Sequence, residues 1–203
     1  MTNQYFEKNP TTDHNRQIID FEFYSNVLNF MTDSGTFSKH RIDYGSKVLM
    51  TTFVEQVTID KSQQVLELGS GYGPITIALA KVFPMIHMTG IEINQRAYEL
   101  AIENSQKNGV NNVTFLHEDV CQFNQDKTYH HVLTNPPIRA GKNVIQKFVN
   151  IAHSHLTTQG KLWVVIQKKQ GAPSMQKHMQ EIFGNVEKVM QDKGYWILVS
   201  EKI

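Results

Sequence analysis

Three glycines stand at alternating positions directly after a short apolar run, and their spacing indicates a ligand-binding turn. Residues 65–68 read as a buried strand, and the residues after Pro74 read as the first turn of a helix. A strand, a glycine turn and a helix N-terminus in that order bring backbone close to a bound nucleotide or nucleoside. Glycine permits positive φ angles and has no Cβ to collide with a ligand. The three residues are Gly69, Gly71 and Gly73.

The spacing of these glycines excludes two common phosphate-binding loops. The dinucleotide fingerprint needs a glycine where Pro74 stands, and a P-loop needs a Gly-Lys-Ser or Gly-Lys-Thr that this turn lacks. An ordinary tight turn is the simpler alternative. The string that begins at Glu67 is E-x-G-x-G-x-G. It resembles motif I of the class I S-adenosylmethionine-dependent methyltransferases, which implies S-adenosylmethionine as the cofactor.

An acidic residue ends the second expected strand, residues 86–91. Glu92 lies 21 residues beyond Gly71, where a carboxylate can accept hydrogen bonds from both hydroxyl groups of a ribose. The alternative is a surface glutamate that caps the helix expected at 94–108. We therefore expect Glu92 to bind the ribose of the cofactor.

A second acid follows the third expected strand, residues 113–117. The methyltransferase resemblance implies that Asp119 binds the exocyclic amino group of adenine, with Glu118 as the neighbour that could take its place. Solvation of a loop is the simpler reading of this acidic pair. The resemblance also implies further cofactor-binding residues, namely Phe37, Glu67, Ser70, Ile93, Val120 and Asn135.

The most specific chemical motif is Asn135-Pro136-Pro137, which follows an expected strand at 131–134. Two consecutive prolines fix the backbone and remove two N–H donors, so the local carbonyl groups stay free to accept. The motif resembles motif IV, (D/N)PP(F/Y/W), of methyltransferases that modify nitrogen conjugated to a planar system. The resemblance implies that these three residues are catalytic and that the Asn oxygen and the Pro136 carbonyl accept both hydrogens of a substrate amino group. Ile138 departs from the pattern, because an aromatic ring usually stacks there. A Pro-Pro turn that ends a strand is the alternative.

A longer resemblance narrows the family. The string NPPIRAGK, with the segments 33–38 and 43–46, is similar to the catalytic domain of the small-subunit ribosomal RNA guanine-N2 methyltransferases. The similarity covers roughly residues 15–203, and longer members carry a second, degenerate copy in front. It implies in-line methyl transfer to a guanine N2, with ribosomal RNA or the small ribosomal subunit as partner. The alternatives are a methyltransferase for adenine N6 or a protein glutamine amide, and a non-catalytic RNA-binding or ribosome assembly factor.

Positive charge is concentrated in one segment, although the formal net charge is only +1. Residues 127–180 contain no Asp or Glu and hold eight Lys and Arg residues. Four of these cations follow the fourth and fifth expected strands, which are neighbours in this family's sheet, so we expect them on one rim beside the methyl donor. A solvated basic face is the alternative. With the apolar residue of motif IV, the expected substrate-binding residues are Ile138, Arg139, Lys142, Lys168 and Lys169.

Length and composition are ordinary for one globular domain of 203 residues, with 40% hydrophobic and 19% charged residues. No stretch approaches the ~20 apolar residues of a membrane span, and the N-terminus lacks the apolar run of a signal peptide. Cys121 is the single cysteine and the nine histidines lack metal-ligand spacing, so we expect no disulfide and no metal site. His153 and His155 are expected as solvated helix-end residues. These features predict a cytoplasmic protein.

Strand-like and helix-like segments alternate along most of the chain, which predicts an α/β fold with a parallel sheet. The methyltransferase resemblance implies a Rossmann-like, seven-stranded, mostly parallel sheet with helices on both faces and an antiparallel hairpin at the C-terminus. We expect residues 1–203 to form a single methyltransferase domain, in which 1–58 are an N-terminal hairpin and helix extension and 59–203 the cofactor-binding and catalytic core. Further expected elements are strands at 18–24, 27–31, 161–167, 186–190 and 195–200, and helices at 43–57 and 174–183.

Overall fold

A seven-stranded sheet forms the centre of the molecule, in a computed structural model that describes residues 8–9, 12–59 and 61–203. The strand order is β5-β4-β3-β6-β7-β9-β8, and β9 runs antiparallel to both of its neighbours. This confirms the expected Rossmann-like methyltransferase sheet with its antiparallel strands at the C-terminus. The strands are β3 (Gln63–Leu68), β4 (Ile86–Glu92), β5 (Val113–His117), β6 (Tyr129–Thr134), β7 (Leu156–Gln167), β8 (Glu187–Asp192) and β9 (Tyr195–Glu201).

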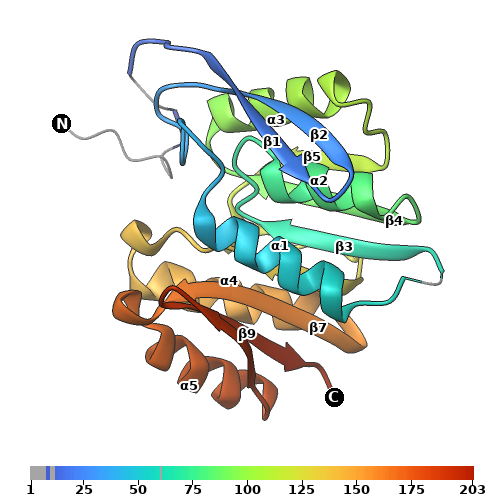
Figure 1. The fold of residues 1–203 in the computed structure, drawn as a ribbon. Helices are drawn as coiled ribbons and strands as arrows, with labels where there is room; N and C mark the ends of the chain where they lie inside the picture. Colours follow the sequence, from blue (N-terminus) through green and yellow to red (C-terminus); the bar gives the residue numbers. More distant parts are fainter. Residues whose placement is uncertain (1–7, 10–11, 60) are drawn as a thin grey trace.

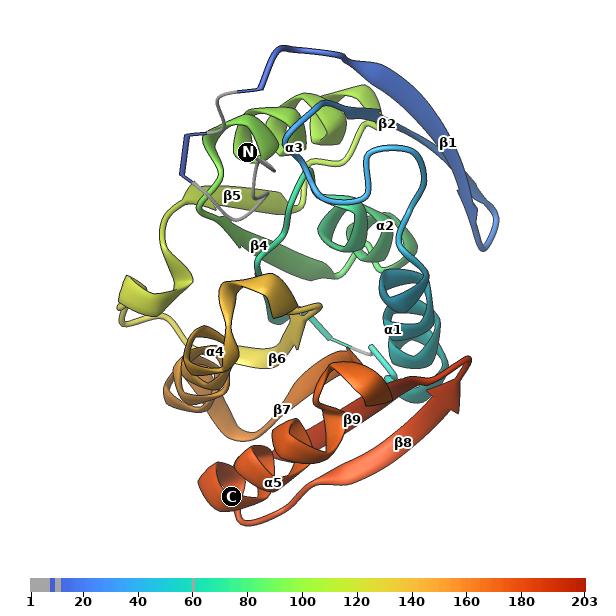
Figure 2. The same cartoon turned by 90° about the vertical axis from the view of Figure 1, so that its left-hand side faces the viewer.

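Helices cover both faces of this sheet (Figure 2). One apolar cluster lies between the sheet and the first three helices, and a second lies between the opposite face and the last two. The helices are α1 (Tyr44–Gln56), α2 (Pro74–Val82), α3 (Gln95–Lys107), α4 (Lys142–His155) and α5 (Ala172–Phe183). Short 3₁₀ turns follow three of the strands: η1 (Val120–Gln122), η2 (Ile138–Ala140) and η3 (Lys168–Gln170). No helix in the described part of the chain is long and apolar enough to cross a membrane.

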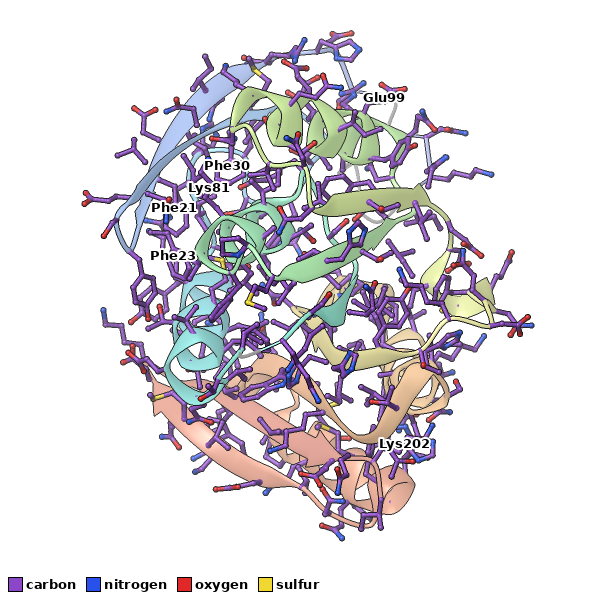
Figure 3. All side chains as sticks on the ribbon, turned by 90° about the vertical axis from the view of Figure 1, so that its right-hand side faces the viewer. Phe21, Phe23, Phe30, Lys81, Glu99 and Lys202 are labelled. Atoms are coloured by element: carbon purple, nitrogen blue, oxygen red, sulfur yellow. The ribbon has the colours of Figure 1, made fainter. Side chains whose placement is uncertain are left out.

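The expected N-terminal hairpin is present as β1 (Gln17–Phe23) and β2 (Asn26–Thr32), paired antiparallel. It lies over α2 and α3 (Figure 1). Buried residues alternate with exposed or half-buried ones along both strands, so one face packs against the rest of the protein and the other faces outward. Phe21, Phe23 and Phe30 lie between the hairpin and α2 (Figure 3) and join the first apolar cluster. The first seven residues of the expected extension lie outside the described residues.

Asn104 of α3 and Asn108, which caps the C-terminus of that helix, bind the backbone edge of β2. The side chain of Asn104 accepts from the N–H of Met31 at 2.7 Å and donates to its carbonyl at 3.0 Å. Asn108 makes the same pair of bonds to Asn29, at 2.9 and 2.8 Å. A side-chain amide carries one donor face and one acceptor, as a peptide group does, so these residues occupy the place of a third strand.

Helix α4 was not predicted from the sequence. Its apolar residues recur at helical spacing, and Ile145, Phe148, Val149 and Ala152 are buried against the sheet. Strand β7 also begins five residues before the expected start at 161. Its first residue, Leu156, pairs with Tyr129, and the register then shifts before the regular pairing starts at Lys161.

His155, at the end of α4, is buried and not solvated as expected. Its exposed fraction is 5%. Nδ1 bonds the carbonyl of Ile151 at 2.8 Å, Nε2 accepts from the N–H of Gln125 at 3.4 Å, and the ring lies 4.6 Å from that of Phe123. The histidine thus satisfies its own polar atoms inside the second cluster. His153 is half-buried.

Candidate active site

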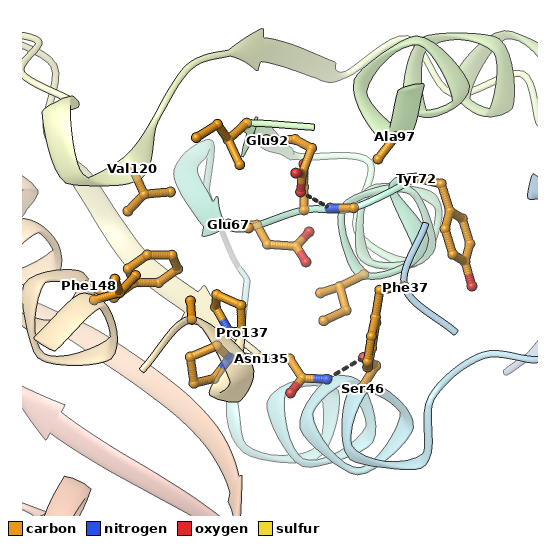
Figure 4. A pocket seen from close by; sticks show the side chains of 18 of the residues that line it. Phe37, Ser46, Glu67, Tyr72, Glu92, Ala97, Val120, Asn135, Pro137 and Phe148 are labelled. Atoms are coloured by element: carbon orange, nitrogen blue, oxygen red, sulfur yellow. Dashed lines mark hydrogen bonds between the residues drawn. The ribbon is translucent and has the colours of Figure 1, made fainter. Parts of the chain in front are cut away.

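A cavity of about 280 Å³ lies at the C-terminal ends of β3, β4 and β6. The strand order reverses direction at β3, and this is where ligands bind in open α/β sheets. The cavity brings together most of the residues expected at the cofactor and the catalytic centre (Figure 4). These are Phe37, Glu67, Gly69, Ser70, Gly71, Glu92, Ile93, Asp119, Val120, Asn135, Pro136 and Pro137.

The turn after β3 takes its shape from glycine. Gly69 and Gly71 have φ angles of 77° and 56°, in the left-handed region that residues with a Cβ rarely adopt. The N–H groups of Gly69 and Ser70 both donate to the carbonyl of Ile91 at 2.9 Å, which ties the turn to β4. The turn therefore presents backbone to the cavity with no side chain at two of its positions.

Gly73 is the expected cofactor residue that the structure places outside the cavity lining. It is the N-cap of α2, with a φ angle of 90°. A Cβ at this position would stand 2.9 Å from Ile77 and 3.1 Å from Phe115. The glycine permits close packing of α2 against β5.

Glu92 is buried at the end of β4, with an exposed fraction of 7%, so the surface-cap alternative is wrong. Its two oxygens accept from the backbone N–H groups of Gly71 and Asn94, each at 2.8 Å, and the cap of α3 is Asn94 itself. Burial raises the pKa of Glu92 to about 7, against the backbone hydrogen bonds that favour its charged form. The N–H of Ile93 also favours the charged form, and beyond these three backbone donors the carboxylate keeps some capacity to accept.

Glu67 lies beneath the glycine turn, almost completely buried. Its Oε2 accepts from the N–H and the hydroxyl of Thr76 in α2, at 2.9 and 2.5 Å. Burial raises the pKa of Glu67 to about 8, opposed by the bonds from Thr76, and the charge of Glu92 adds to the rise. Two carboxyl groups with raised pKa values thus line one cavity, and near pH 7 Glu67 is mainly protonated while Glu92 is partly ionised.

Asp119, not Glu118, lines the cavity. Its Oδ1 accepts from the N–H of Cys121 at 2.8 Å and so caps the turn η1. Val120 follows it and is buried. Asp119 itself is half-buried, so its carboxylate is held by η1 and lines the cavity.

Asn135 directly follows β6, beside the glycine turn that follows the adjacent strand β3, and it lines the cavity. Its Nδ2 donates to Oδ2 of Asp43 and to Oγ of Ser46, each at 3.0 Å. Figure 4 shows the Nδ2 end of the amide turned toward Ser46 and the Oδ1 end turned away from it. Among the described residues none donates a hydrogen bond to Oδ1, so this oxygen keeps its capacity to accept.

Several lining residues were not predicted from the sequence. Ser46 comes from α1, and Val144 and Phe148 come from α4. The helical spacing of the apolar residues in α4 was the available signal for the last two. Cys121 also lines the cavity, and burial raises the pKa of its thiol.

The expected substrate-binding residues lie beside this cavity and not within its lining. Ile138 and Lys142 line a second cavity of about 180 Å³ between α4 and the start of α5. Arg139 belongs to η2, and Lys168 and Lys169 to η3, at the ends of the adjacent strands β6 and β7. The four cations are exposed, and no described carboxylate forms an ion pair with them.

The described residues contain no group of three or more His, Cys, Asp or Glu side chains that could hold a metal ion.

Comparison with known proteins agrees with this geometry. Residues 27–199 match the family described as methyltransferase small domain. Uncharacterized protein YbxB of Bacillus subtilis (strain 168) is 39% identical over 206 residues, which span 100% of both chains. Ribosomal RNA small subunit methyltransferase C of Escherichia coli O1:K1 / APEC is 27% identical over 91% of this chain and 52% of that protein.

Among solved structures, the T. thermophilus 16S rRNA N2 G1207 methyltransferase (RsmC), in complex with AdoMet and guanosine, has a TM-score of 0.84. It is 24% identical over 93% of this chain and 51% of that chain, so the likeness shows the fold. The chain spans about half the length of these two ribosomal RNA methyltransferases. Because the family model matches most of its length, the chain belongs to the methyltransferase small domain family and is a methyltransferase whose cofactor is S-adenosylmethionine.

Proposed function

We propose that the protein methylates the exocyclic N2 of a guanine in small-subunit ribosomal RNA. The observation that carries the proposal is the placement of Asn135 and Pro136 in the lining of the cofactor cavity after β6, with the amide nitrogen of Asn135 bonded to Asp43 and its Oδ1 left to accept, beside a proline carbonyl. Two acceptors in this place suit a nucleophile that brings two N–H groups, such as an exocyclic amino group. The likeness to ribosomal RNA methyltransferases supports the choice of substrate.

The lining of the cavity fits S-adenosylmethionine. Glu92 offers acceptor lone pairs to the ribose hydroxyls, and Asp119 offers an acceptor to the adenine amino group. Ser70 also lines the cavity, and its hydroxyl is buried against Gly90 with no hydrogen-bond partner among the described residues. Glu92, whose pKa is about 7, can carry a negative charge near the cofactor's cationic groups. When bound, the cofactor supplies an electrophilic methyl group on a sulfonium sulfur.

Asn135 and Pro136 orient the nucleophile. By accepting both hydrogens of the amino group, they draw its lone pair out of conjugation with the ring and direct it toward the cavity. Their contribution is positioning, because the leaving-group chemistry is already present in the sulfonium. The proton lost from nitrogen leaves to water after methylation, so no general base is named. Ile138 offers the target base an apolar contact in place of a stacked ring.

The exposed cations on η2, α4 and η3 hold the RNA. They follow two adjacent parallel strands, so they lie on the edge of the sheet where the cavity opens. Phosphate groups bind Lys and Arg with release of counterions, which supplies most of the sequence-independent affinity.

Isotope labelling tests the proposal directly. Purified protein is incubated with S-adenosylmethionine bearing a deuterated methyl group and either protein-free small-subunit RNA or assembled small subunits. Mass spectrometry of the digested nucleosides should find the label in N2-methylguanosine, and the variant Asn135→Ala should remove it. Label in N6-methyladenosine, or in a glutamine of added protein, would replace the guanine proposal. Binding of RNA without any transfer would support the assembly-factor alternative.

A further inference from the structure

The start of α1 holds the amide of the catalytic asparagine. Both hydrogens of Asn135 Nδ2 are used, one by Asp43 Oδ2 and one by Ser46 Oγ, each at 3.0 Å. A carboxylate can only accept, so the nitrogen of the amide and not its oxygen must face Asp43. This contact joins residues 92 positions apart in the chain.

We propose that Asp43 and Ser46 are positioning residues, which keep the amide of Asn135 with its oxygen toward the reacting amino group. The inference rests on the function proposed above. If the amide turned over, its NH₂ would meet the NH₂ of the substrate, two donors would face each other, and the nucleophile would not be held. Asp43 and Ser46 need not touch the substrate, since they act through Asn135.

The two residues are themselves held in place. Asp43 is the N-cap of α1, and the Oδ2 that accepts from Asn135 also accepts from the N–H of Ser46 at 3.1 Å. The next residue, Tyr44, is bonded through its hydroxyl to Asp192 at the end of β8. Ser46 has an exposed fraction of only 4%. A group that must fix a catalytic amide works best on a rigid support of this kind.

The departure at Ile138 makes such a support more important. An aromatic ring at that position would clamp the target base and limit its movement relative to Asn135. The half-buried side chain of Ile138 presents no planar surface. More of the orientation of the reacting group must then come from the acceptors, and their own orientation is set by α1.

The first experiment compares Ser46→Ala and Asp43→Ala with Thr52→Val. Thr52 is the matched control because its buried hydroxyl lies in the same helix and bonds only the carbonyl of Val48, at 2.8 Å. We expect kcat to fall on the order of tenfold to a hundredfold in the two test variants, since small displacements of a positioning group have effects of this size. The KM for RNA and the affinity for S-adenosylmethionine should change by less than about twofold. Thr52→Val should keep the wild-type kcat, and Asp43→Asn should lose less than Asp43→Ala, because one acceptor oxygen remains.

A second readout does not depend on the substrate. In ¹⁵N-labelled protein, the two side-chain N–H signals of Asn135 should be well separated and slow to exchange with water, because both hydrogens are bonded. They are assigned by their loss in Asn135→Ala. In Ser46→Ala and Asp43→Ala the signals should shift and exchange faster, and in Thr52→Val they should not move.

An exchange of the two side chains is the sharpest test. Asn135→Asp alone puts a second carboxylate at the position of the amide, 3.0 Å from Asp43 Oδ2. Two like charges this close cannot both ionise freely, so the single variant should be nearly inactive and should show a new pH dependence. The double variant Asp43→Asn with Asn135→Asp restores one amide and one carboxylate. It should recover at least about fivefold in kcat over the single variant and lose the new pH dependence.

The outcomes separate the inference from the proposed function. If the wild type transfers no methyl group to guanine N2, the proposed function fails, and the amide signals still test the contact with α1. If the wild type is active and Ser46→Ala keeps both its kcat and the Asn135 signals, the positioning role is wrong. If Asp43→Ala fails to fold, Ser46→Ala and the exchange variant decide the question.

Discussion

The carboxylate of Glu92 accepts a hydrogen bond from the backbone N–H of Gly71 at 2.8 Å, which joins the end of β4 to the glycine turn after β3. The same carboxylate accepts from Asn94 at the start of α3. One buried side chain therefore sets the relative positions of two segments that line the cofactor cavity. The ribose site and the turn should respond together when Glu92 is changed.

Replacement of Glu92 by alanine should weaken the binding of S-adenosylmethionine. Loss of hydrogen bonds to a charged acceptor corresponds to on the order of 1–3 kcal/mol, or roughly fivefold to 150-fold in Kd. Calorimetric titration measures the change. Glu118→Ala is the matched control, because this neighbouring acid of the site lies outside the cavity lining. An unchanged Kd in Glu92→Ala would remove the residue from the site.

Replacement of Asn135 by alanine should leave cofactor binding intact and remove most of the methyl transfer. Its oxygen is argued to hold the amino group in the geometry of the transition state, so the loss should appear in kcat and not in the Kd of the cofactor. Single-turnover kinetics with saturating cofactor measure this. A wild-type rate in this variant would contradict the assignment of the Asn-Pro-Pro segment.

The raised pKa of Glu67 predicts that the stability of the protein depends on pH. Its pKa of about 8 in the folded protein lies above the ordinary value of 4.5. Between these two pH values the folded protein retains a proton that the unfolded chain has released. The contribution of Glu67 to the free energy of unfolding is therefore fully present below about pH 4.5, and it is lost as the pH rises through about 8. As the pH rises between about 4.5 and 8, the free energy of unfolding of the wild type relative to Glu67→Gln should fall by about 1.4 kcal/mol per pH unit. Urea unfolding of both proteins at several pH values measures the difference, and parallel curves would contradict the prediction.

Replacement of the four rim cations by glutamine should weaken RNA binding and lower its salt dependence. Each neutralised single-strand phosphate contributes about 0.7 to the slope of log K against log salt, so the slope should flatten by up to about three units. The substitutions are Arg139→Gln, Lys142→Gln, Lys168→Gln and Lys169→Gln, and cofactor affinity should not change.

A control with the same change in charge is available at the opposite edge of the sheet. Lys61 and Lys127 precede β3 and β6, and Lys81 and Lys107 stand in the last turns of α2 and α3. Glutamine at these four exposed positions should leave the salt slope of RNA binding almost unchanged. Equal effects of the two quadruple variants would indicate a general effect of net charge, and the basic segment would then be a solvated face.

Much of the fold could be predicted from local sequence patterns. Strands β4 and β5 are apolar runs bounded by turn residues, and Asp43 and Gly109 mark the start of α1 and the end of α3. The cofactor side of the site could be predicted too, because Gly71 and Glu92 have a recognisable spacing along adjacent strands.

The link between Asn135 and α1 could not be predicted in this way. The two hydrogen bonds of this link span 89 and 92 positions of the chain. They form only because α1 docks against β7, on the far side of β6. Nothing in the local sequence encodes that docking. Helix α4 is a different case, because its apolar spacing was present and was not used. Without this helix, the burial of His155 at its end could not be predicted either.

The side chains of Asn104 and Asn108, which bind the edge of β2, have a consequence for the order of folding. A two-stranded hairpin is at best marginally stable alone in water, and these bonds join β2 to residues 73 and 79 positions later in the chain. The hairpin is therefore expected to become stable only after α3 has formed and docked on the sheet. The amide hydrogens of Met31 and Asn29 should exchange with solvent only when the hairpin separates from α3, so their exchange rates report the stability of that docking.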